Sequence, residues 1–221
     1  MTISAFFDTD ICFADYICDY FDEKLMDPDN WTFPVTDKGI PGIEIVEKKF
    51  GLWKDVVKQN NIGRVLGTNS QKVNTIKEDI EQNGVDCTQP PVYIDIETGD
   101  IITGGHRHDV CSILAMPGYM MVFVRCESKW ARKRFAKALN NERVFHATLN
   151  NEDEVIEHIK YGIAESEITC QQQIEDEIKL IANNSLSKTI QGRLVKEMIS
   201  FIHNSGNSNV KLERYTAHNE K

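Results

Sequence analysis

The sequence predicts an α+β fold, in which a small mixed-sheet domain precedes a helical region. Apolar and polar residues alternate over 43–47 and 92–96, as is typical of strands, and residues 97–100 form a hairpin turn. Beyond residue 129 the apolar residues recur at helical spacing. We expect four parts: an acidic N-terminal segment over 1–40, an α/β domain over 41–127, a helical region over 128–203 and a polar tail over 204–221.

The α/β domain is expected to begin with the strand over 43–47, and apolar residues at helical spacing predict a helix over 50–58. A second helix is predicted to begin at Asn69 or Ser70, both of which can act as N-caps, and to end at Gly84. Its apolar face is expected to hold Val73, Ile76 and Ile80.

The stretch over 101–110 passes from an apolar strand through Gly104 and Gly105 into the first turn of a helix. The N–H groups and the dipole of a helix N-terminus favour an anion, and glycine lets a phosphate approach the backbone. Arg107 in that turn can bind two phosphate oxygens at once. The alternative is a tight turn with a surface arginine. The apolar positions of the helix are expected to be Val110, Ile113 and Leu114.

His106, His108 and Asp109 are residue types that bind metals, but residues two apart on a helix point away from each other. The imidazole of His106 is instead suited to act as a general base or as a phosphate donor. The alternative is a turn histidine bonded to the backbone. Cys111 is expected to pack against the sheet.

An apolar strand is predicted over 119–125, followed by helices over 129–140, from Asn150 or Asn151, and over 174–181 and 190–202. The last two helices resemble a helix-turn-helix. The second begins with residue types that reach phosphates and base edges, namely Ser187, Lys188, Thr189, Gln191 and Arg193. A plain helical hairpin explains the apolar pattern equally well, and Gly192 is unfavourable in a recognition helix.

The formal net charge of −9 excludes a surface that is basic throughout. Residues 1–30 contain eight acids and one lysine, whereas residues 129–143 contain six bases and one acid. The basic helix is suited to contact nucleic-acid phosphates or a nucleotide, and the alternative is a solvated helix. The acidic segment is either a partner-binding element, a mimic of nucleic acid or, as we expect, a solvated face.

Six cysteines are scattered with no CxxC pair, which predicts free thiols in the reducing cytoplasm and no structural zinc site. The sequence contains no run of 18 apolar residues and no basic leader followed by an apolar stretch. We therefore expect neither a membrane span nor a secretory signal.

The order of these pieces resembles the N-terminal domain of the ParB/sulfiredoxin superfamily over residues 62–165. The Gly-x-x-Arg turn of ParB-like proteins corresponds to Gly104-Gly105-His106-Arg107. Sulfiredoxins have Gly-Gly-Cys-His-Arg, which is one residue longer and includes a cysteine that this chain lacks. A second motif, Glu-Asn-x-x-Arg followed by Asn-Pro-x-Glu, corresponds to residues 139–143 and 150–152. Asn140 and Arg143 match, whereas Leu139 replaces the glutamate.

The resemblance implies a pocket for a nucleoside triphosphate, which is CTP with Mg²⁺ in ParB-like partition proteins and ATP in sulfiredoxins. By residue, it implies that Gly104, Gly105, His106 and Arg107 bind phosphates, that Asn140 lies near the metal and that Arg143 lies near the phosphates. Leu139 in place of the glutamate weakens the expectation of Mg²⁺. The missing cysteine argues against repair of cysteine sulfinic acid.

We therefore expect a ParB-like nucleotide-binding protein that acts on or near DNA. If it hydrolyses the nucleotide, His106 and Arg107 are the candidate catalytic residues, acting by positioning and charge neutralisation. One alternative is a non-enzymatic DNA-binding regulator that uses the C-terminal helices. Another is a ParB-like nuclease or small-molecule kinase. A homodimer is compatible with this expectation, and the modest size and missing motif residues suggest a mobile-element or phage protein.

Overall fold

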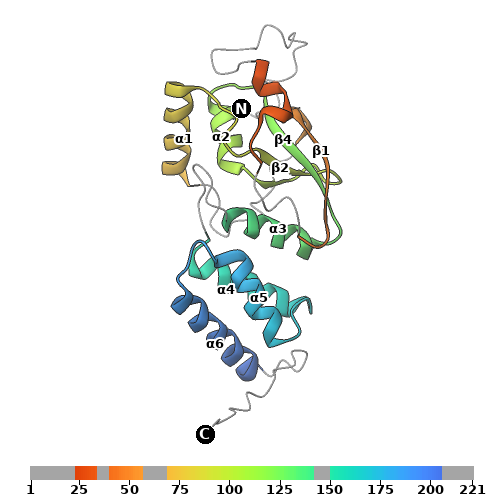
Figure 1. The fold of residues 1–221 in the computed structure, drawn as a ribbon, viewed down its shortest axis with the longest axis vertical. Helices are drawn as coiled ribbons and strands as arrows, with labels where there is room; N and C mark the ends of the chain where they lie inside the picture. The colour runs from red at the N-terminus through yellow and green to blue at the C-terminus, as the bar shows by residue number, and fades with distance from the viewer. Residues whose placement is uncertain (1–22, 34–39, 57–68, 142–149, 206–221) are drawn as a thin grey trace. The chain divides into compact units, whose positions relative to one another are not determined.

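A computed structural model describes residues 23–33, 40–56, 69–141 and 150–205 (Figure 1). The chain divides into two compact units, residues 1–147 and residues 148–221. The described part contains a four-stranded mixed sheet and six α-helices, which confirms the predicted α+β class. No helix in the described ranges is long and apolar enough to cross a membrane.

The sheet of the first unit has the strand order β1-β4-β2-β3. β1 (Ile43–Leu52) pairs antiparallel with β4 (Gly118–Cys126), from Ile43 opposite Cys126 to Leu52 opposite Gly118. β2 (Val92–Asp95) pairs parallel with β4 and antiparallel with β3 (Ile101–Thr103). β4 is therefore a central strand, and this position explains why most of its residues are buried.

Three helices accompany this sheet. α1 (Ser70–Asn83) packs against α2 (Gly105–Ile113), and α3 (Lys129–Asn141) contacts β3, β1 and β4. The predicted bounds of α1 are confirmed, because the Asn69 side chain accepts the Lys72 N–H at its start and Gly84 adopts φ 74° at its end. Its buried face holds the predicted residues Val73, Ile76 and Ile80.

The predicted helix over 50–58 is wrong within the described residues. Phe50 and Leu52 belong to β1, and a single 3-10 turn, Trp53–Asp55, follows. The pairing with β4 extends the strand to Leu52, so tertiary hydrogen bonding overrides the local spacing. In α2, Val110 and Cys111 are buried as predicted, whereas Ile113 is 56% exposed. α3 lies in the first unit, although the sequence grouped it with the helical region.

The described part of the acidic segment packs onto the sheet domain. It contains two 3-10 turns, η3 (Glu23–Met26) and η4 (Pro28–Asn30), both of which contact β1. Leu25 and Trp31 belong to the hydrophobic core of the sheet domain. Asp27 and Asp29 are exposed, as expected of a solvated acidic face, whereas Leu25 and Trp31 of the same segment are buried. Residues 1–22 and 34–39 lie outside the described ranges.

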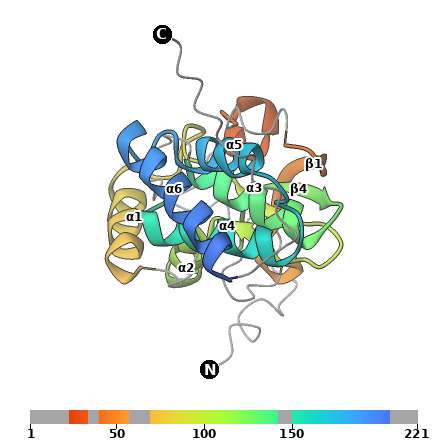
Figure 2. The ribbon, with the colours of Figure 1, turned by 90° about the horizontal axis from the view of Figure 1, so that it is seen from below.

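The second unit contains α4 (Glu152–Ala164), α5 (Gln171–Ala182) and α6 (Lys188–Ser205), each of which contacts the other two (Figures 1 and 2). Asn151 begins α4 with a capping box to Glu154, as the sequence predicted. The apolar core of this unit includes Val155, Ile159, Ile163, Ile174, Ile178, Ile181, Leu194, Met198 and Ile202.

The second unit also encloses a polar pair. His158 of α4 and Glu177 of α5 are both buried, and His158 Nε2 lies 2.9 Å from Glu177 Oε1. This interaction links two helices inside the second unit.

Candidate functional site

The N-terminus of α2 is preceded by Gly104, which has a left-handed backbone with φ 104°. A Cβ atom at this position would lie 2.7 Å from Val92 Cγ2 and 3.1 Å from Val92 Cα. Glycine is therefore required both by the backbone angle and by the close approach to β2. The carbonyl of Gly104 accepts the N–H of His108 at 3.0 Å, so the helix begins directly after the turn.

The first turn of α1 lies beside the first turn of α2. The backbone N–H of Asn69 donates to His106 Nε2 at 2.9 Å, while the Asn69 side chain caps α1. The first N–H groups of each helix lack partners inside the helix, and both helix dipoles present their positive ends here. Two positive helix ends at one place form an environment that favours an anion.

This contact determines the tautomer of the neutral His106 side chain. Because Nε2 accepts a hydrogen bond, the proton of the neutral imidazole is on Nδ1. The alternative predicted from the sequence, a turn histidine bonded to the backbone, is therefore correct for Nε2. In this tautomer Nδ1 carries the N–H and is the ring atom that can donate a hydrogen bond. Its predicted roles as base or phosphate donor remain predictions.

Arg107 points into the domain. Its residue is 8% exposed, and its guanidinium hydrogen-bonds the hydroxyl of Tyr119 in β4. The alternative of a surface arginine is therefore wrong. Burial raises the pKa of Tyr119 well above its usual value, although the positive charge of Arg107 opposes that shift. The tyrosine hydroxyl therefore stays neutral, and its oxygen accepts a hydrogen bond from the guanidinium.

A chain of hydrogen bonds continues from Tyr119 to α1. The Tyr119 hydroxyl donates to Gln89 Oε1 at 3.0 Å, and Gln89 Nε2 lies 3.3 Å from Asp79 Oδ2. Trp53 stacks on Tyr119 with ring centroids 6.4 Å apart, and Trp31 meets its edge at 5.5 Å. The ring that receives Arg107 is thus fixed by aromatic and polar contacts.

The metal alternative at His106, His108 and Asp109 is not supported by the positions of these side chains. His106 contacts Asn69, whereas His108 is buried edge-on against Trp53, with ring centroids 5.1 Å apart. Within the described ranges, no group of three or more His, Cys, Asp or Glu side chains is arranged to hold a metal ion.

Two basic residues of α3, Arg132 and Lys137, are paired or buried, whereas Lys129 is exposed and Lys133 and Arg134 are partly buried. The predicted contact of this helix with phosphates stays a prediction. Arg132 Nη1 lies 3.2 Å from both Asp95 Oδ2 and Asp100 Oδ2, which lie at the two ends of the β2–β3 turn. Lys137 is 2% exposed. Arg132 thus links α3 to the β2–β3 turn. Burial and the nearby Asp95 raise the pKa of Cys126 to about 12, so this thiol stays protonated near neutrality.

The remaining predicted residues lie at the end of α3. Asn140 is partly buried in the last turn, and Leu139, which replaces the motif glutamate, is buried. Arg143 lies outside the described residues. The predicted roles of Asn140 near a metal and Arg143 near phosphates stay predictions.

Two of the α6 residues that the sequence predicted to read DNA bind other residues of the second unit. Gln191 is buried and donates to the carbonyls of Ala182 and Leu186, so it caps the end of α5. Arg193 pairs with Glu152 of α4. Gln191 is therefore not exposed to read bases, whereas the Arg193 side chain is 59% exposed. Lys188, Thr189 and Lys196 are exposed.

The sequence reasoning missed three residues of the site: Asn69 as the partner of His106, and Tyr119 and Gln89 as the partners that hold Arg107. Asn69 was recognised as a cap, but its contact with residue 106 is a tertiary one. A tyrosine inside an otherwise apolar strand was the available signal, because a buried hydroxyl requires a partner.

No protein-family model and no curated protein matches this chain. Among solved structures, the chain is similar to the "Structure of the C2221 form of Pnob8-like ParB-N domain", with a TM-score of 0.49 and 11% sequence identity. The match covers 74% of this chain and 72% of that one. That neighbour is a ParB-N domain.

Proposed function

We propose that this chain binds the polyphosphate of a nucleoside triphosphate, CTP or ATP, where the N-termini of α1 and α2 meet. The main support is the contact between Asn69 and His106, which brings two positive helix ends together. Arg107 adds a guanidinium one residue further along α2. An anion is the class of ligand that this combination favours.

Each residue has a distinct part in the proposal. The backbone N–H groups of Gly105 and His106, at the start of α2, donate to phosphate oxygens. His106 donates through Nδ1, since its Nε2 is occupied by Asn69. Arg107 neutralises the negative charge of the phosphates, while the hydrogen bond to Tyr119 holds its guanidinium in place. Asn140 and Arg143 complete the site as the ParB-like motif implies, and Mg²⁺ would reach it on the nucleotide phosphates.

A thermal-shift screen of ATP, CTP, GTP and UTP, with and without Mg²⁺, tests the proposal. A ligand present at about 100 times its Kd stabilises the folded chain by about 2.7 kcal/mol, so binding raises the melting temperature. Inorganic phosphate and a nucleoside without phosphates are the controls. Release of phosphate from the bound triphosphate, measured separately, decides whether the chain is a hydrolase.

DNA binding by the second unit is the second candidate function. Lys188, Gly192 and Lys196 are exposed and spaced four residues apart, so they share one side of α6. Fluorescence anisotropy with duplex DNA at several salt concentrations tests it. The double variant Lys188→Glu/Lys196→Glu should weaken binding and reduce its salt dependence, while Lys179→Glu on α5 should change little. DNA cleavage by the wild-type chain would instead favour the nuclease alternative.

A further inference from the structure

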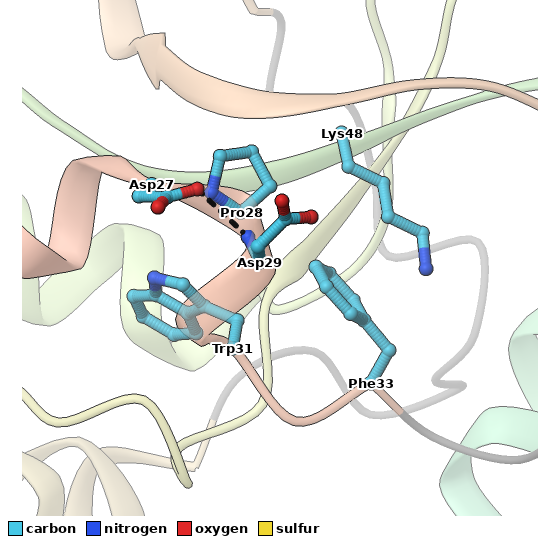
Figure 3. Close-up of a pocket in the computed structure, with 6 residues that line it drawn as sticks. All are labelled: Asp27, Pro28, Asp29, Trp31, Phe33 and Lys48. Atoms are coloured by element: carbon cyan, nitrogen blue, oxygen red, sulfur yellow. Dashed lines mark hydrogen bonds between the residues drawn. The ribbon is translucent and has the colours of Figure 1, made fainter.

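A pocket of about 550 Å³ lies at the join between the N-terminal segment and the sheet (Figure 3). Five of its lining residues come from the segment: Asp27, Pro28, Asp29, Trp31 and Phe33. The sixth, Lys48, comes from β1. Two carboxylates and two aromatic rings therefore surround the pocket, which we name the cation pocket.

The backbone that forms the cation pocket is well anchored. Asp27 Oδ1 accepts the N–H of Asp29 at 3.0 Å and so caps η4 (Figure 3). The Trp31 indole donates to the carbonyl of Leu25 at 2.8 Å, and the N–H of Thr32 donates to the carbonyl of Cys87 at 2.9 Å. The two side-chain bonds thus order the segment itself, and the backbone bond to Cys87 holds it to the rest of the sheet domain.

An ammonium group already occupies part of this pocket. Lys48 Nζ lies 3.6 Å from the centre of the Phe33 ring, which is a cation–π contact (Figure 3). This contact is independent of the two carboxylates and shows which chemical group the aromatic wall accepts. The Asp29 carboxylate is exposed, and its oxygens take part in no hydrogen bond or ion pair among the contacts described for residues 23–33.

We propose that the cation pocket binds an alkylammonium group of another molecule, in exchange with the Lys48 ammonium. A lysine side chain of a partner polypeptide and a polyamine both have this chemistry. The incoming ammonium lies over the Phe33 ring, with the Asp29 carboxylate as its counter-charge. The displaced Lys48 side chain moves toward solvent. The cation pocket shares no lining residue with the proposed triphosphate site, although Trp31 contacts Tyr119 beside Arg107. Titrations with an ammonium probe and with a triphosphate test the two proposals separately.

Titration of the full-length chain, followed by NMR of the Trp31 indole N–H, tests this proposal. The probes are Nα-acetyl-lysine amide, spermidine and, as the uncharged match of the lysine probe, Nα-acetyl-norleucine amide. A saturable shift with either cation but not with norleucine supports the site, and the pair of cations distinguishes a peptide from a polyamine source. No saturable shift, or an equal shift with norleucine, overturns it.

Two variants of opposite expected effect sharpen the test. Lys48→Met removes the internal competitor and should tighten binding about 2- to 5-fold, the worth of one exposed cation–π contact. Asp29→Asn keeps the shape but removes the counter-charge and should weaken binding by a similar factor. Lys49→Met, on the same strand, is the control for net charge. Equal affinity in Lys48→Met and Lys49→Met would contradict the exchange.

Discussion

The imidazole of His106 accepts the backbone N–H of Asn69 at 2.9 Å and thereby joins the first turn of α2 to the cap of α1. The contact satisfies one donor that a helix start would otherwise leave to solvent. It also holds two like helix-dipole ends near each other, which is unfavourable unless negative charge is present. The same contact therefore has both a structural and an electrostatic consequence.

His106→Ala should lower the free energy of unfolding by about 1 kcal/mol, the typical net worth of one hydrogen bond, and should weaken triphosphate binding. Thr75→Ala is the control, because it also removes one exposed side-chain hydrogen bond to the backbone, but in the middle of α1. Urea unfolding and nucleotide titration measure the two effects. Equal behaviour of the two variants would show that the Asn69 contact has no special role.

Gly104→Ala should destabilise the chain by about 2–4 kcal/mol, because it combines an unfavourable φ with a clash against Val92. Gly192→Ala is a matched change in α6, where a Cβ would meet nothing within 4 Å. That variant should be neutral or stabilise by about 1 kcal/mol, since alanine favours helix. Urea unfolding of both proteins measures the difference, and similar stabilities would contradict the packing of Gly104 on β2.

Tyr119 should make the free energy of unfolding depend on pH in the alkaline range. Its pKa is raised in the folded state, so above the ordinary value of 10.0 the unfolded chain loses a proton that the folded chain keeps. The free energy of unfolding should therefore fall as pH rises above 10, by about 1.4 kcal/mol per pH unit from this group. Below pH 10 this contribution is fully present.

Tyr119→Phe should lack that part of the pH dependence, and it should lose about 1–3 kcal/mol at neutral pH because Gln89 and Arg107 lose a buried partner. Unfolding curves between pH 7 and 11.5 compare the two proteins. Parallel pH profiles would show that the hydroxyl does not titrate from a buried position.

The buried pair of the second unit gives a prediction for the helical region alone. Glu177→Ala should lower the free energy of unfolding by about 1–3 kcal/mol, since it removes the buried group that His158 Nε2 contacts at 2.9 Å. Asp176→Ala on the same helix removes two exposed contacts, the ion pair with Lys179 and the hydrogen bond from Gln172, and should change stability by about 1 kcal/mol or less. Hydrogen exchange of α4 and α5 amides measures both, and Glu177→Gln should lie between them.

Local signals in the sequence predicted the regular elements well. Asn69, Gly84 and Asn151 mark helix ends because their side chains or backbone angles act within a few residues. The helix predicted over 50–58 failed because the end of β1 is determined by pairing with residues near Gly118, far away in the sequence. Spacing alone does not contain that information.

The site was predicted in part, for the same reason. The turn at Gly104 and the first turn of α2 follow from local chemistry. The direction of Arg107 in α2 depends on Tyr119 in β4, and the role of Arg132 depends on Asp95 and Asp100 at the ends of a turn. A charge count along α3 indicates how many bases are present but not which carboxylates they meet.

The central claim is that Arg107 and the helix ends beside it bind a triphosphate, and calorimetric titration of the full-length chain tests it most directly. Wild-type protein should bind ATP or CTP saturably, Arg107→Ala should bind at least about tenfold more weakly, and Arg107→Lys should lie between them. Lys77→Ala on exposed α1 surface, which removes the same charge, should bind as wild type. Absence of binding to every triphosphate, or equal affinity in folded Arg107→Ala and Lys77→Ala, would contradict the claim.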